Sequence, residues 1–255
     1  MRRRISVIAV LALTGLLLAG CASQQARAFK AVEAKSHSAV TPVEQTAEWA
    51  VKWWMPRHEA VGKRLMQGHV DVLFIGDSIT HGWENAGKEL WETYYAPRNA
   101  VNMGFSGDRT QHVLWRLDHS DFKGISPKLA VIMIGTNNSN GNDNTAEEIA
   151  DGIIAICYRL RTRLRDMKIL VLAIFPRNPG PGDQREKNAE ASRLAARIAD
   201  GKMIHYLDIN KQFLTDQDVL TKAVMPDYLH PNDTGYKIWA EAIESKIAEL
   251  LGEQQ

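Results

Sequence analysis

The stretch of sequence that decides the fold is residues 70–80, which read VDVLFIGDSIT. It begins with a short apolar and β-branched run, and at Gly76 it changes to small and polar residues. A run of this length, bounded by a turn residue, is typical of a strand that is buried on both faces. The stretch therefore predicts a central strand that delivers Asp77 and Ser78 to one edge of a sheet.

Four further runs of the same kind follow along the chain, and helical patterns separate them. The predicted strands are 70–75, 100–103, 129–134, 169–174 and 203–207, and the predicted helices are 87–95, 109–118, 145–165, 184–200 and 232–251. Strands that alternate with helices favour a parallel sheet with helices on both faces. We therefore expect one α/β domain over residues 43–255. Its first segment, 44–67, is amphipathic, and we interpret Trp49, Trp53 and Trp54 there as packing residues.

The composition is that of an ordinary globular protein. The chain has 255 residues, of which 24% are charged and 45% hydrophobic, and its formal net charge is +1. These values exclude collagen-like, disordered and polytopic membrane proteins, and they predict no electrostatic footprint for nucleic acid. The sequence contains no zinc-type spacing of His and Cys and no glycine-rich phosphate loop after a strand, so we expect neither a metal nor a nucleotide cofactor.

The N-terminus has the pattern of an export signal. Residues 1–21 read MRRRISVIAVLALTGLLLAGC, in which arginines precede an apolar run and the final four residues resemble a bacterial lipobox. An uncleaved anchor helix is the alternative, but an apolar run of about 14 residues is short for a membrane span. We expect a signal peptide over 1–20, a lipidated Cys21, and a polar tether over 21–42. The chain is thus predicted to be an exported lipoprotein of the cell envelope, at the outer membrane or periplasmic face.

Chemically interesting residues follow the predicted strands, where ligand sites of parallel sheets lie. Ser78 after the first strand is explained equally well as a nucleophile or as a helix N-cap. Gly104 after the second strand is either an exposed N–H donor or a turn glycine, and Asp108 is expected to cap the next helix. Asn137, in the sequence GTNN after the third strand, offers a neutral amide donor suited to an oxyanion. We interpret the neighbouring Asn138 as a turn residue.

A His and an Asp stand together just before the last predicted helix, in the sequence DYLHP of residues 227–231. A neutral histidine is an effective general base near pH 7, and an Asp three residues earlier can hold its tautomer. Either residue alone is more simply explained as a surface or turn residue. The combination favours a base, His230, that is oriented by Asp227.

The blocks GDS, NMGFSGDRTQHVLWRL, GTNN and DYLH occur in this order within residues 70–251. Together they resemble the SGNH (GDSL) hydrolase family, in the branch of the catalytic subunits of platelet-activating-factor acetylhydrolase and their bacterial relatives. The resemblance implies a flavodoxin-like three-layer α/β/α sandwich with a five-stranded parallel sheet. It also implies Ser78 as nucleophile, His230 as general base and Asp227 as its orienter. The oxyanion donors would be the backbone N–H groups of Ser78 and Gly104 and the side chain of Asn137.

The expected activity is therefore that of a serine esterase without a cofactor. The family branch favours short acyl groups such as acetyl, and the exported address favours carbohydrate esters. Two alternatives stay open, a phospholipid, lysophospholipid or thioester hydrolase and a non-catalytic glycan-binding lipoprotein. Cys157 is expected to be a buried thiol, and the related subunits suggest a homodimer. The roles of His81, Trp83 and the loop 176–182 stay open at this point, with pocket lining and packing equally good for the first two.

Overall fold

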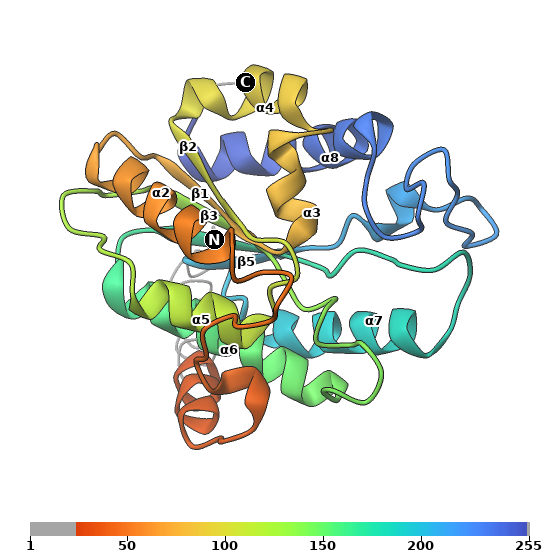
Figure 1. Ribbon diagram of the computed structural model, residues 1–255, viewed down its shortest axis with the longest axis horizontal. Coiled ribbons are helices and arrows are strands. Elements are labelled where there is room, and N and C mark those ends of the chain that lie inside the picture. Colours follow the sequence, from red (N-terminus) through yellow and green to blue (C-terminus); the bar gives the residue numbers. More distant parts are fainter. Residues whose placement is uncertain (1–23, 254–255) are drawn as a thin grey trace, which may run out of the picture.

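A computed structural model describes residues 24–253 of the chain (Figure 1). Its centre is one parallel sheet with the strand order β2-β1-β3-β4-β5, which is the order of flavodoxin-like doubly wound sheets. The strands are β1 (Val72–Gly76), β2 (Ala100–Gly104), β3 (Leu129–Met133), β4 (Lys168–Leu172) and β5 (Ile204–Leu207). The predicted five-stranded parallel sheet is thus confirmed, with each strand within two residues of its expected bounds.

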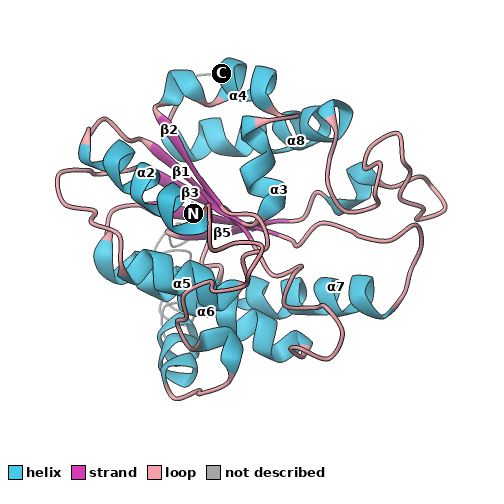
Figure 2. Cartoon of the chain, in the orientation of Figure 1, coloured by secondary structure: helices cyan, strands magenta, loops and turns pink. Residues whose placement is uncertain are grey.

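Helices cover both faces of the sheet (Figure 2). One face carries α3 (Ser78–His81), α4 (Lys88–Tyr94) and α8 (Asp233–Leu251), and the other carries α2 (Trp54–Met66), α5 (Thr110–Asp118), α6 (Ala146–Arg163) and α7 (Asp183–Ala195). Alternate residues of β1 supply the two cores, because successive side chains of a strand point to opposite faces. Val72 and Phe74 belong to the core under α8, whereas Leu73 and Ile75 belong to the core under α5 and α6.

The strand register brings the carboxyl ends of the central strands to one level. Gly76 at the end of β1 is paired with Gly104 of β2 and with Met133 of β3. Both glycines are needed for close packing of α3. A Cβ atom at Gly76 would lie 2.1 Å from Thr80 Oγ1, and one at Gly104 would lie 2.2 Å from the backbone nitrogen of His81. The short helix that begins with Ser78 is therefore seated directly on the sheet edge.

The described part of the predicted tether contains a helix and packs on the domain. Residues 24–33 are helical, and Val32 and Ala39 are buried against the core and the helices. The ring of Phe29 lies 5.1 Å from that of Tyr158 on α6. Apolar side chains spaced along this polar segment therefore dock it onto the domain. The predicted signal peptide and Cys21 lie outside the described residues, and within 24–253 no helix has the length and apolar character of a membrane span.

The tryptophans before and at the start of α2 differ in their environment. Trp54 is buried, as expected of a packing residue, and Trp53 packs partly against the same core. Trp49 is 56% exposed, so the interpretation as a packing residue is wrong for this position.

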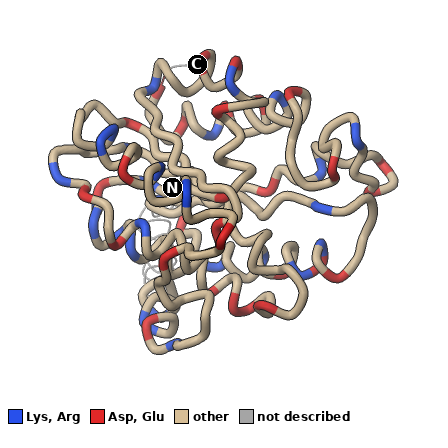
Figure 3. Tube along the Cα trace, in the orientation of Figure 1, with Lys and Arg blue, Asp and Glu red and all other residues tan. Residues whose placement is uncertain are grey.

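Cys157 is buried in α6 as predicted, and burial raises the pKa of its thiol to about 12. Positively and negatively charged residues are both spread over the fold (Figure 3).

Candidate active site

Three side chains from two distant segments of the chain form a continuous hydrogen-bonded network. Ser78 is the first residue of α3, directly after β1, and its Oγ lies 2.9 Å from Nε2 of His230. The other ring nitrogen of His230, Nδ1, lies 2.6 Å from Oδ2 of Asp227. In this arrangement the imidazole accepts the hydroxyl proton on one side and donates to the carboxylate on the other. The structure thus brings the predicted nucleophile, base and orienter together.

The loop between Asp227 and His230 is built to hold this geometry. Oδ1 of Asp227 accepts hydrogen bonds from the backbone N–H groups of Leu229, at 3.0 Å, and His230, at 2.7 Å. Tyr228 between them has φ 60°, a left-handed conformation that costs free energy in a bulky residue. Burial tends to raise the pKa of Asp227, but the hydrogen bonds from His230 and Leu229 outweigh it and hold that pKa below its ordinary value. The orienting group therefore stays a carboxylate.

Asp77, the residue before Ser78, decides between the two roles that the sequence left open for Ser78. Asp77, not Ser78, is the N-cap of α3, and its Oδ1 accepts a hydrogen bond from the N–H of Ile79 at 3.0 Å. The hydroxyl of Ser78 is consequently free to face His230. The N–H of Ser78 occupies the first helical position, where the backbone has no helical acceptor. Asp77 is fully buried, and burial raises the pKa of its carboxyl to about 7.

Asn137 lies at the exit of β3 with its amide fixed from one side. Its Nδ2 donates to the backbone oxygen of Asp108 at 2.9 Å, which leaves the second N–H of the same group available.

Asp108 is not the helix cap that the sequence led us to expect, because the N-cap of α5 is Arg109. Its buried carboxylate instead accepts from Trp54 Nε1 and Arg116 Nε, both at 2.7 Å. Burial raises the pKa of Asp108 to about 6, although the attraction of Arg116 opposes this.

Gly104 is not available as the predicted oxyanion donor. Its N–H donates to Oδ1 of Asn102 at 2.8 Å, within the same strand end. The glycine is required here for packing, since a Cβ atom would collide with the backbone of α3. The prediction of Gly104 as a donor is therefore corrected.

Sequence reasoning overlooked Gly107, which has the features expected of that donor. It stands in a turn closed by the hydrogen bond from Asp108 N to Phe105 O, 3.1 Å long, and its φ of 75° suits glycine. Within residues 24–253 no group accepts its N–H, and it lines a cavity together with Asn137. The sequence does contain this glycine, between Ser106 and Asp108. However, sequence alone does not distinguish a glycine that forms a turn from one that also donates its N–H to a substrate.

The other residues singled out in the sequence have structural roles. Asn138 lies in a turn, as predicted, and its N–H donates to Gly135 O at 3.0 Å. It is also buried, and its Oδ1 accepts from the N–H of Thr110 at 3.0 Å, which satisfies the start of α5. Trp83 is fully buried and packs on Trp239, with ring centroids 4.9 Å apart. His81 binds Ser106, with Nδ1 3.0 Å from Oγ, and burial lowers its pKa to about 4.

The loop 176–182 connects two parts of the site. Arg177 donates to the backbone oxygen of Thr136, at 2.9 Å, next to Asn137. The N–H of Asn178 donates to the backbone oxygen of Tyr228, also at 2.9 Å, between Asp227 and His230. The loop therefore ties the oxyanion side of the site to the loop that carries the base.

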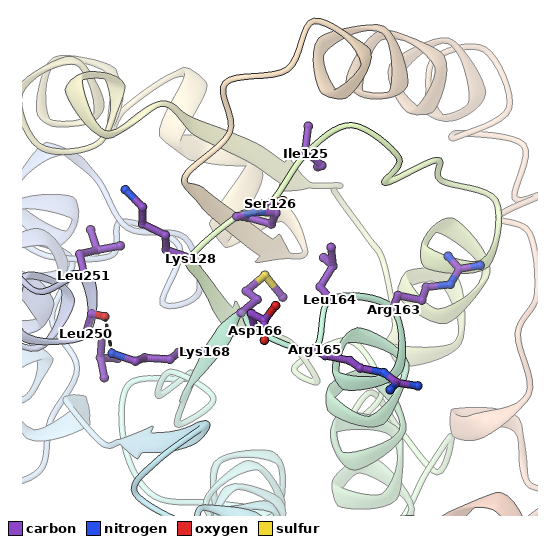
Figure 4. Close-up of a pocket in the computed structure, with 12 residues that line it drawn as sticks. Ile125, Ser126, Lys128, Arg163, Leu164, Arg165, Asp166, Lys168, Leu250 and Leu251 are labelled. Atoms are coloured by element: carbon purple, nitrogen blue, oxygen red, sulfur yellow. Dashed lines mark hydrogen bonds between the residues drawn. The ribbon is translucent and has the colours of Figure 1, made fainter.

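A second cavity lies at the opposite end of the sheet (Figure 4). It is lined by Lys128 and Lys168, at the amino ends of β3 and β4, and by Leu250 and Leu251 of α8. Lys168 Nζ donates to the backbone oxygen of Leu250 at 2.7 Å across its wall. Because Ser78 and Asn137 follow the carboxyl ends of β1 and β3, this cavity is not part of the candidate site. Within 24–253, no group of His, Cys, Asp and Glu is arranged to hold a metal ion.

Comparisons with known proteins show the family to which the chain belongs. Residues 74–238 match the model of the GDSL-like Lipase/Acylhydrolase family. The chain is 36% identical over 202 residues to platelet-activating factor acetylhydrolase IB subunit alpha2 of Rattus norvegicus, which covers 78% of this chain and 86% of that one.

Two solved structures share the fold. A GDSL-like lipase from Bacteroides thetaiotaomicron superposes with a TM-score of 0.57 at 23% identity, over 78% of this chain and 97% of that one. Axe2, an acetylxylan esterase from Geobacillus stearothermophilus, gives a TM-score of 0.55 at 20% identity, over 72% and 94% of the two chains. The family match covers more than half of the sequence and the acetylhydrolase relative most of it. The chain therefore belongs to the GDSL-like lipase/acylhydrolase family and is a carboxylic ester hydrolase.

Proposed function

We propose that this hydrolase is a serine esterase that removes short acyl groups, above all acetyl, from carbohydrate esters. The observation that carries the proposal is the contact of Ser78 Oγ with His230 Nε2 at 2.9 Å, with Asp227 behind the same ring at 2.6 Å. A hydroxyl next to an oriented imidazole is the arrangement that acyl transfer requires. The triad is also accessible, since the side chains of His230 and Asp227 are 44% and 55% exposed.

The reaction follows from the positions of these groups. His230 takes the proton of Ser78 as Oγ attacks the ester carbonyl carbon, and the carbonyl oxygen becomes an oxyanion. The donors that we assign to this oxyanion are the N–H groups of Ser78 and Gly107 and the free N–H of Asn137. When the tetrahedral species collapses, the alcohol leaves with the proton from His230. Water then attacks the acyl-enzyme with His230 again as base, which releases the acid and restores Ser78.

The short acyl group and the carbohydrate are supported by different observations. The name of the rat relative refers to acetyl hydrolysis, and the structural neighbour Axe2 is an acetylxylan esterase. The predicted export signal places the ester outside the cytoplasm, where cell-envelope and environmental glycans occur. We accordingly retain lipidation of Cys21 and a cell-envelope location as part of the proposal, and the homodimer stays a prediction.

A phospholipid ester is the second candidate, because the rat relative is named for platelet-activating factor. The cavity beside Gly107 and Asn137 carries Arg109, His112 and Asn140 among its lining residues. A long acyl chain prefers an uninterrupted apolar channel, so this lining favours a short acyl group and a polar alcohol.

The test is the release of acid from a panel of esters, with Ser78→Ala as control. Wild type should hydrolyse p-nitrophenyl acetate and release acetate from acetylated glycans, with turnover declining as the acyl chain lengthens to palmitate. Ser78→Ala should lose at least about 10⁴-fold in kcat and should no longer be labelled by an organophosphonate. Near wild-type turnover in Ser78→Ala would refute the proposed nucleophile, and a preference for palmitate or for phospholipid acetate would refute the substrate class.

A further inference from the structure

Trp49 is a large apolar side chain left open to solvent beside the oxyanion site. It is 56% exposed, although burial of an indole is normally among the most favourable contributions to folding. Its indole edge rests on Gly107, where a Cβ atom would lie only 2.1 Å from Cη2. Because this exposed aromatic face lines a cavity that also holds polar groups, it is a candidate ligand-binding surface.

The position of Trp49 is fixed by the backbone around it. The next residue, Ala50, is fully buried, and its N–H donates to Ala47 O at 2.8 Å. Trp53 Nε1 donates to the backbone oxygen of Trp49 at 3.1 Å, and the two indoles lie with centroids 6.1 Å apart. The indole is therefore presented by an ordered turn, so little conformational freedom has to be lost when a ligand covers it.

Trp49 lines the same cavity as two of the three assigned oxyanion donors, Gly107 and Asn137. The cavity has a volume of about 360 Å³, and it is lined by Gln45, Ala47, Trp49, Gly107, Arg109, His112, Asn137 and Asn140. Ligand pockets in proteins have volumes of roughly 300–1,000 Å³. Whatever occupies this cavity lies against Asn137 and is thus next to the reacting carbonyl.

The residues that line this cavity favour a sugar ester over an ester with a quaternary ammonium headgroup. A pyranose ring has an apolar C–H face that packs on an indole and equatorial hydroxyls that bond amide and guanidinium groups, which Gln45, Asn140 and Arg109 supply. A quaternary ammonium headgroup also prefers a tryptophan face, but none of the residues that line this cavity is acidic and could neutralise it. The acidic partner of Arg109, Asp143, is already paired with it, at 2.5 Å.

We infer that Trp49 and this cavity form a subsite for a neutral pyranose ring of an acetylated glycan, which positions the ester against Gly107 and Asn137. The inference rests on the proposed esterase function and names its substrate-positioning residue. Trp49 lies outside residues 74–238, which match the family model, whereas Gly107 and Asn137 lie within them.

The experiment compares two substrates in the same protein preparations. We would measure kcat and KM for an acetylated xylo-oligosaccharide and for p-nitrophenyl acetate, which has no sugar ring. In Trp49→Ala the ratio of the two kcat/KM values should fall about 10-fold, mainly through a higher KM for the oligosaccharide, and Trp49→Phe should restore part of it. Val51→Ala is the matched control, because Val51 is 55% exposed on the same segment and does not line the cavity.

A binding measurement separates this inference from the proposed function. Calorimetric titration of Ser78→Ala with the same oligosaccharide should show binding that weakens about 10-fold when Trp49→Ala is added. An unchanged ratio, or an equal loss for both substrates with unchanged binding, would overturn the subsite. Wild type that cleaves p-nitrophenyl acetate but neither binds nor deacetylates the oligosaccharide would also overturn it. Wild type that hydrolyses no ester would refute the proposed function, and the titration would then decide the subsite alone.

Discussion

Replacement of Asn137 by alanine tests the oxyanion site most directly. The structure assigns different tasks to the two N–H groups of its amide. One donates to Asp108 O at 2.9 Å and fixes the side chain, and the other is left for the substrate. The substitution removes both, so a loss of positioning and a loss of transition-state stabilisation are expected together.

The two losses differ in size and in the quantity that reports them. Loss of one oxyanion donor costs about 3–4 kcal/mol, which corresponds to a fall in kcat of about 10²–10³-fold. Loss of the hydrogen bond to Asp108 costs about 1 kcal/mol of folding free energy, or about 2–4 °C in Tm for a chain of this size. KM should change little, because the donor acts on charge that develops only in the transition state.

The assay is steady-state hydrolysis of p-nitrophenyl acetate together with thermal unfolding of the same sample. Asn142→Ala is the matched control, since Asn142 is the same residue type in the same loop and is exposed. It should leave kcat and Tm close to wild type. A fall in kcat of less than about 5-fold in Asn137→Ala, or a loss confined to KM, would refute the assignment of Asn137 to the oxyanion site.

Three further substitutions test the surroundings of the site. Asp227→Asn should lower kcat about 10⁴-fold, because an amide that donates to His230 Nδ1 forces the wrong tautomer; steady-state kinetics with Tm unchanged would check this. Wild-type stability should fall by on the order of 4 kcal/mol between about pH 4 and pH 7, since the buried Asp77 keeps its proton up to a pKa of about 7 whereas the unfolded chain ionises near 3.8. Urea unfolding of Asp77→Asn should show a smaller decline, with the remainder contributed by Asp108, whose buried carboxyl has a pKa of about 6, and curves parallel to those of wild type would contradict this. Gly104→Ala should cost about 2–3 kcal/mol, because its Cβ meets the backbone nitrogen of His81 at 2.2 Å, and an unchanged Tm would count against this packing.

The parts of the fold that the sequence predicted are those that depend on local composition. Each buried strand is a short apolar run bounded by turn residues, and this pattern needs no knowledge of the neighbours. The triad was also accessible from sequence. Ser78 follows the first strand directly, and Asp227 and His230 are close enough in the chain for one loop to hold both. Their convergence follows from the rule that parallel strands end at one edge.

The errors concern groups whose hydrogen-bond partners the sequence pattern does not indicate. Asp108 looked like a helix cap because it precedes a helix, but its buried carboxylate is bound by Arg116 and by Trp54, 54 residues earlier. Gly104 looked like a donor because it ends a strand, yet the side chain of Asn102 already takes its N–H. Hydrogen-bond partners decide whether Gly104 or Gly107 keeps a free N–H, and the composition of the sequence does not reveal these partners.

Asp108 also fixes the positions of two proposed oxyanion donors, Gly107 and Asn137. Its carboxylate is bound in the core, its N–H closes the turn that contains Gly107, and its backbone oxygen accepts from Asn137. One buried residue thus fixes two of the proposed oxyanion donors to the interior of the domain. The base, by contrast, lies on a partly exposed loop, where His230 is 44% exposed. Because oxyanion stabilisation depends on donors that need not reorganise during the reaction, the rigid core carries the electrostatic part of the site, and the exposed loop carries the proton transfer.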